Sequence, residues 1–86
     1  MTQQQIFQTI GLDLKRVGQY LYLGFPQKAR YYFDEANNLL AENPFPENLS
    51  KPLTIANMTD ESLDKTRAED FLTAGSIIFS RAKTTS

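Results

Sequence analysis

The stretch Gln19-Tyr-Leu-Tyr-Leu-Gly-Phe-Pro-Gln-Lys-Ala-Arg-Tyr-Tyr-Phe33 decides how this chain folds. Gly24 can adopt the left-handed backbone conformation that commonly ends a helix. Pro26 suits the first turn of a following helix, where its missing N–H has no partner to lose. Because only Phe25 separates these two signals, the sequence predicts two helices that fold back on each other as an antiparallel αα-hairpin.

Before this corner, apolar residues recur at alternating intervals of three and four positions, which predicts an amphipathic helix over about residues 3–23. Thr2 and Gln5 form a capping-box pattern at its start. Gly11 and Gly18 lie one heptad apart, and they indicate either a close approach by another helix or glycines tolerated at the surface. The apolar face consists of Phe7, Ile10, Leu14, Val17 and Leu21.

After the corner, the same rhythm predicts a second helix over about residues 26–42, with a face made of Ala29, Phe33, Ala36 and Leu40. Residues 44–58 hold three prolines, which exclude a long helix there. The segment is nevertheless too apolar for a free linker, so we expect a long ordered loop that lies against the helices. A third helix is expected over about residues 60–82, with Thr59 as its N-cap. The apolar face of this helix contains Ala68, Phe71, Leu72, Gly75, Ile78, Phe79 and Ala82.

The predicted fold class is therefore all-α: a single three-helix domain over residues 1–86, built on an antiparallel αα-hairpin with a long ordered loop before helix three. A chain of 86 residues suits one hydrophobic core.

Composition argues against several classes of function. The chain has no histidine and no cysteine, and these are the commonest general base near neutral pH and the usual thiolate nucleophile or ligand. No loop has the spacing of an oxygen-ligand metal site or of a phosphate-binding motif. We therefore expect no enzymatic activity, no catalytic residue, no cofactor and no metal.

Nine basic and ten acidic residues give a net charge of −1, whereas nucleic-acid-binding domains normally carry a basic face. No segment is apolar for long enough to span a bilayer, and the N-terminus lacks the features of a secretion signal. We expect a soluble, cytoplasmic protein that binds neither nucleic acid nor membranes.

Six of the ten aromatic residues lie within residues 19–33. Neighbouring residues in a helix point about 100° apart, so these rings cannot all face the core. We expect Tyr22, Phe25 and Tyr31 to point outward, and large exposed aromatic side chains are frequent anchors of protein interfaces. Together with Phe45 in the loop, they are the candidate protein-interaction residues. Alternatively, the tyrosines only cover the corner while their hydroxyl groups contact water.

The hairpin resembles a tetratricopeptide repeat over about residues 10–44. The matching positions are Tyr20, Gly24, Ala29, Phe33 and Ala36, with small residues where the two helices of such a repeat pack closely. The pattern departs from the family at Asp13, Arg16 and Val17, where the repeat has Trp, Leu and Gly, and Pro44 lies about three positions late. The resemblance implies a peptide- or protein-binding scaffold.

The leading hypothesis is a non-enzymatic protein-interaction module, a small adaptor or regulatory subunit whose partner is an unidentified protein or a second copy of the chain in a homodimer. One alternative is a domain that binds an apolar small ligand in a cavity between its helices, lined by Tyr20, Phe33, Phe71 and Phe79. Another is a purely structural subunit of a larger assembly.

Overall fold

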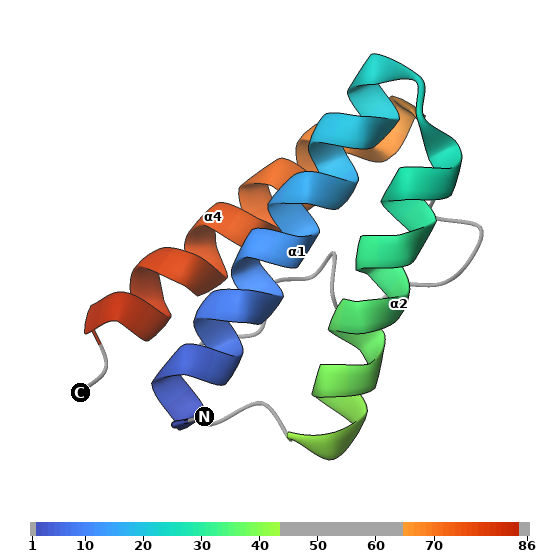
Figure 1. Ribbon diagram of the computed structural model, residues 1–86. Helices are drawn as coiled ribbons and strands as arrows, with labels where there is room; N and C mark the ends of the chain where they lie inside the picture. Colours follow the sequence, from blue (N-terminus) through green and yellow to red (C-terminus); the bar gives the residue numbers. More distant parts are fainter. Residues whose placement is uncertain (1, 44–64, 85–86) are drawn as a thin grey trace.

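The structure is a computed structural model that describes residues 2–43 and 65–84, and the regular secondary structure in this part of the chain is entirely helical (Figure 1). The predicted all-α fold class is confirmed. The interaction candidate Phe45, the expected loop 44–58 and the expected cap at Thr59 lie outside the described residues.

Helix α1 spans Gln3–Leu23 and begins at the predicted capping box. The Gln5 amide donates to the Thr2 hydroxyl at 3.2 Å, and the Thr2 amide donates to Oε1 of Gln5 at 2.9 Å. These two bonds satisfy amides that a helix start otherwise leaves without an acceptor. The five apolar residues of the predicted face are all buried.

The corner after α1 is a Schellman motif. Gly24 adopts the left-handed conformation, with φ of 86°, and its amide donates to the Leu21 carbonyl at 3.2 Å. The Phe25 amide donates to the Tyr20 carbonyl at 2.8 Å. Such motifs usually bring the side chains at these two positions together, and the rings of Tyr20 and Phe25 do meet edge to face, with centroids 6.4 Å apart. The same turn therefore ends α1 and brings the rings of Tyr20 and Phe25 into contact.

Helix α2, Pro26–Glu42, starts with the proline expected at its first position and returns along α1 (Figure 1). Its inner face buries Ala29, Phe33 and Ala36, so small residues lie where the two helices approach each other.

The last helix, α4, spans Ala68–Thr84 and follows a short 3-10 turn, η2, at Lys65–Arg67. The sequence predicted an α-helix over about 60–82. Residues 60–64 of this range lie outside the described residues; within the described part, α-helical geometry runs from Ala68 to two residues past the expected end.

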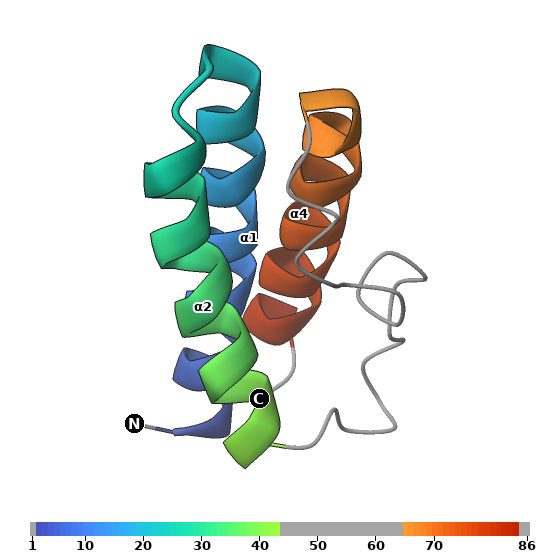
Figure 2. The ribbon, with the colours of Figure 1, turned by 90° about the vertical axis from the view of Figure 1, so that its right-hand side faces the viewer.

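Helix α1 lies between the other two, with α2 and α4 on either side of it (Figures 1 and 2). Phe33 of α2 and Phe71 of α4 close the core, because their buried rings meet edge to face with centroids 6.1 Å apart. The buried apolar side chains are Phe7, Ile10, Leu14, Val17, Leu21, Ala29, Phe33, Ala36, Ala68, Phe71, Ala74, Ile78 and Ala82.

Glycines bring α1 and α4 together. A Cβ atom added at Gly11 would lie 2.9 Å from the Gly75 carbonyl oxygen, and one added at Gly18 would lie 2.6 Å from the Ala68 carbonyl oxygen. Both separations are shorter than real Cβ contacts. Of the two interpretations of these glycines, the structure supports the close approach of another helix. Because Gly11 faces Gly75 while Gly18 faces Ala68, α4 runs antiparallel to α1.

No helix among residues 2–43 and 65–84 has the length and apolar character needed to cross a membrane.

Candidate functional site

The three described interaction candidates are exposed at the corner end of the molecule. Tyr22 is 66% exposed, Phe25 49% and Tyr31 64%. Leu23, which the sequence analysis did not single out, is 62% exposed. We call these four residues the corner surface. Its position follows from the Schellman turn, since the residues on both sides of a sharp corner cannot all reach the core.

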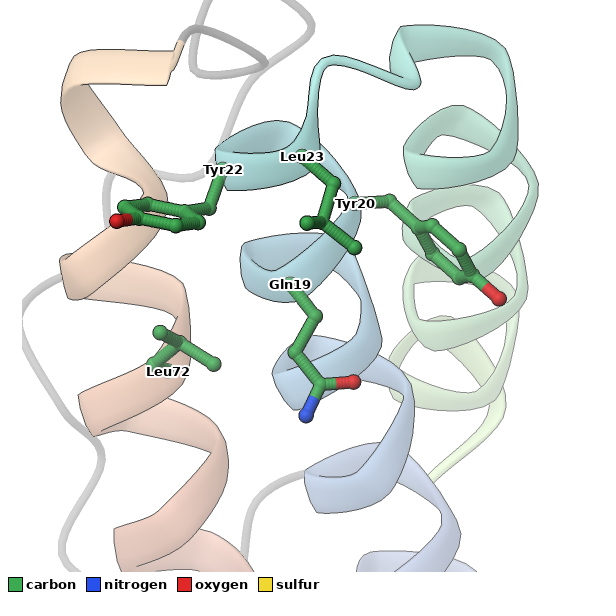
Figure 3. A pocket seen from close by; sticks show the side chains of 5 residues that line it. All are labelled: Gln19, Tyr20, Tyr22, Leu23 and Leu72. Carbon is green, nitrogen blue, oxygen red and sulfur yellow. The ribbon is translucent and has the colours of Figure 1, made fainter.

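The corner surface extends over two sides of the hairpin. Figure 3 shows the Tyr22 ring directed toward α4 and Leu72, whereas the Tyr20 ring points to the opposite side, toward α2. Between them lies an open groove of about 420 Å³, and its lining is mainly apolar. The groove is lined by Gln19, Tyr20, Tyr22, Leu23 and Leu72.

On the α2 side, four rings follow one another across the α1–α2 junction. Tyr20 stacks on Tyr32 with centroids 5.8 Å apart and planes 5° from parallel. Phe25 meets the edge of Tyr20, and Tyr31 meets Tyr32 at 5.0 Å and nearly at right angles. We call these four rings the aromatic seam. Tyr20 and Tyr32 are both half-buried, because they cover the hairpin rather than enter its core.

Two cations lie over the seam. The Arg16 guanidinium is 5.2 Å from the centre of the Tyr32 ring. The Lys28 ammonium is 5.5 Å from the centre of Tyr20 and 5.1 Å from that of Phe25. At these distances the face of an aromatic ring attracts a positive charge. Spacing along the chain does not predict this arrangement, because Arg16 reaches a ring on a different helix.

Asp13 is the one buried charged side chain in the described part of the chain, at 1% exposure. Neither of its carboxyl oxygens makes a hydrogen bond of ordinary length with any described residue. Burial, and after it the Glu35 carboxyl on α2, raise the pKa of Asp13, whereas the Arg16 guanidinium lowers it; together they bring this pKa from 3.8 to about 7. A carboxyl group in this environment is stabilised when it is protonated.

The sequence contained a signal for the burial of Asp13. It lies three positions after Ile10 and four before Val17, which places it on the inner side of α1. In the comparison with the tetratricopeptide pattern, Asp13 stands out only as a departure.

A raised carboxyl pKa is common among catalytic acids. Asp13, however, is covered by protein, and a general acid must reach the atom that it protonates. No group of three or more acidic, histidine or cysteine side chains that could hold a metal ion occurs within residues 2–43 and 65–84. The buried carboxyl of Asp13 therefore makes the stability of the fold depend on its protonation.

The four residues proposed to line a ligand cavity do not gather around one space. Phe33 and Phe71 contact each other directly. Tyr20 lies on Tyr32 near the corner, whereas the backbone of Phe79 packs beside Gly11. Nine residues of helix separate Tyr20 from Gly11, which is roughly 13 Å along the axis of α1.

Comparisons of the chain with known proteins give no relative: no family model, no curated protein and no solved structure matches it.

Proposed function

We propose that this protein is a non-enzymatic interaction module, a small adaptor or regulatory subunit, that binds a partner protein through its corner surface. The observation that carries the proposal is the gathering of four large apolar side chains at one end of the hairpin, each about half exposed or more. Large apolar side chains exposed near one another on a small monomer often mark a binding site. The absence of cysteine fits action in a reducing compartment such as the cytoplasm.

The geometry of the corner surface supports the proposal. Tyrosine and phenylalanine provide a large contact area while losing little side-chain entropy on binding. The Schellman turn and the ring contacts within the seam hold two of these rings, Phe25 and Tyr31, in place before a partner binds. An interface that is already ordered avoids part of the entropic cost of association. The resemblance of the hairpin to a tetratricopeptide repeat, a scaffold that binds peptides and proteins, points to the same class of function.

The test is a comparison of the wild-type chain with a Tyr22→Ser, Tyr31→Ser variant in affinity capture from the source cells, followed by sedimentation measurements on the purified proteins. Both tyrosines are exposed, so folding should be retained, and far-UV circular dichroism checks this. A matched control is Gln27→Ser, which changes an exposed side chain beside the same corner.

We expect the tyrosine variant to lose a specific partner, or to lose self-association if the partner is a second copy of the chain. The control should keep both. The proposal is wrong if the wild type and the tyrosine variant capture the same proteins and both sediment as monomers over the accessible concentration range.

A further inference from the structure

We propose that the aromatic seam, together with Arg16 and Lys28, binds an extended acidic segment of the partner protein. In this arrangement aspartate or glutamate side chains pair with the two cations, and apolar side chains between them lie on the rings. The inference rests on the proposed function and adds the chemistry of the partner to it.

Charge is distributed unevenly along the chain. Residues 14–33 contain four basic residues and no acidic residue, although the whole chain carries a net charge of −1. Arg30 is paired with Asp34 at 3.2 Å, and the Lys15 ammonium lies 5.9 Å from the ring of Phe79 on α4. Arg16 and Lys28 are the basic residues that remain at the seam.

Arg16 and Lys28 are exposed, and neither has an ion pair with a carboxylate in the described part of the chain. Each is held against aromatic rings on one side, and its remaining N–H groups are available to solvent. A cation that is held in place loses less side-chain entropy when it pairs with a carboxylate than a freely moving one. Hydrogen bonds between such charged groups are also stronger than those between neutral groups. The seam is therefore complementary to a surface that is both acidic and apolar.

The distances define the size of the expected segment. From Arg16 to the Tyr32 ring is 5.2 Å, from there to the Tyr20 ring 5.8 Å, and from that ring to Lys28 5.5 Å. Because these steps give an upper limit on the separation of the cations, two carboxylates bound by them are at most about five residues apart in extended chain, at ~3.4 Å per residue. Apolar residues between the two acidic positions would face the stacked tyrosines.

A single-stranded nucleic acid is the main competitor for a surface with aromatic rings and cations. Such binders expose ring faces on which bases stack, along a positively charged groove. In the seam, Tyr20 and Tyr32 stack on each other, and only two cations are available. These features favour a protein segment, and an oligonucleotide enters the test as a competitor.

The experiment is a selection of peptides from a random display library on the immobilised full-length protein, with counter-selection on an Arg16→Glu, Lys28→Glu variant. We expect enrichment of peptides with two acidic residues within five positions of each other and apolar residues between them. The best peptide, labelled with a fluorophore, is then titrated against each protein. Its affinity should fall at least about tenfold for Lys28→Glu and should decrease with added salt, because an ion pair at the surface is screened.

Arg67→Glu is the matched control, since it reverses an exposed cation on η2, away from the seam, and should leave the affinity nearly unchanged. A peptide in which the acidic residues are replaced by lysine should bind Lys28→Glu better than it binds the wild type. Circular dichroism of each variant separates loss of binding from loss of folding.

Either of two binding results would overturn the inference while leaving the proposed function intact, as would the absence of any enriched peptide. One is the enrichment of apolar peptides without acidic residues, with binding that Tyr31→Ser weakens and Lys28→Glu does not. The other is displacement of the selected peptide by single-stranded oligothymidine together with direct, salt-sensitive binding of that oligonucleotide, which would assign the seam to nucleic acid. If no peptide is enriched on the wild type over the double variant, the seam does not recognise acidic segments. The capture experiment on Tyr22 and Tyr31 then decides the proposed function separately.

Discussion

Asp13 places a carboxyl group where ionisation is costly, and this makes the stability of the whole protein depend on pH. Burial and the Glu35 carboxyl raise the pKa of Asp13 to about 7 in the folded chain. Between about pH 4 and pH 7 the folded state therefore binds more protons at this site than the unfolded state does. A protonated Asp13 can also donate a hydrogen bond to Glu35, which two charged carboxylates cannot form.

We predict that the contribution of Asp13 to the free energy of unfolding falls as the pH rises from about 4 to about 7, by at most roughly 4 kcal/mol at ~1.4 kcal/mol for each unit of pKa shift. Asp13→Asn should flatten this slope and should be more stable than the wild type at pH 8. Asp34→Asn, at an exposed position, is the control. Urea unfolding at a series of pH values measures the effect. If the free energy of unfolding has the same pH dependence in the wild type and in Asp13→Asn, the prediction is wrong.

Gly24 is a second single residue on which stability depends, in this case through its backbone conformation. A Cβ atom there would meet nothing within 4 Å, so only the left-handed conformation, with φ of 86°, opposes a side chain. Gly24→Ala should lower the free energy of unfolding by about 1 kcal/mol, the usual cost for a non-glycine residue in this conformation. Gly24→Asn should cost less, because asparagine tolerates the conformation better. Thermal unfolding compares the two variants. If Gly24→Ala is as stable as the wild type, the left-handed conformation at this position does not oppose a side chain.

At the scale of the helices, the contact between α1 and α4 depends on missing side chains. Alanine at Gly11 would gain up to ~1 kcal/mol of helix propensity, but its Cβ would lie 2.8 Å from the Phe79 amide nitrogen. Relieving such contacts usually costs about 1–3 kcal/mol. We predict that Gly11→Ala lowers the free energy of unfolding, whereas Thr73→Ala, at an exposed position of α4, does not. Chemical unfolding measures which effect is larger, the gain in helix propensity or the cost of the close contact. A higher free energy of unfolding for Gly11→Ala would show that the two helices can move apart at little cost.

The elements that the sequence predicts well are those that local chemistry determines. The capping box at Thr2, the turn at Gly24 and Pro26, and the three-four rhythm of α1 involve residues within a few positions of each other. The partner of Gly11 lies more than sixty residues away, so the sequence left two interpretations open. The stacking of Tyr20 on Tyr32 and the placement of the cations over the seam also depend on how two helices rotate against each other, which spacing alone does not determine.

For the molecule as a whole, α2 and α4 both pack against α1, and the contact between the Phe33 and Phe71 rings also joins α2 directly to α4. We predict a single cooperative unfolding transition, in which far-UV circular dichroism of the helices and near-UV circular dichroism of the tyrosines in the hairpin change together. Phe71→Ala should cost about 3–5 kcal/mol, a large share of the stability of a small domain. Phe25→Ala, at the half-exposed ring, should cost far less. Separate far-UV and near-UV midpoints would show that the hairpin unfolds independently of α4.

The glycine contact has a consequence for the exchange of backbone amide hydrogens with solvent. At Gly11, Gly75 and Phe79 the main chains of two helices approach each other closely, beside the side chains of Lys15 and Phe79. These amides should exchange only when the entire domain unfolds, whereas those at the corner can exchange through small local openings. We therefore expect slow amide exchange at the contact between α1 and α4 and faster exchange at the end of the molecule that carries the corner surface. A partner bound at that end would be detected as a local slowing of exchange, with the slow amides unchanged.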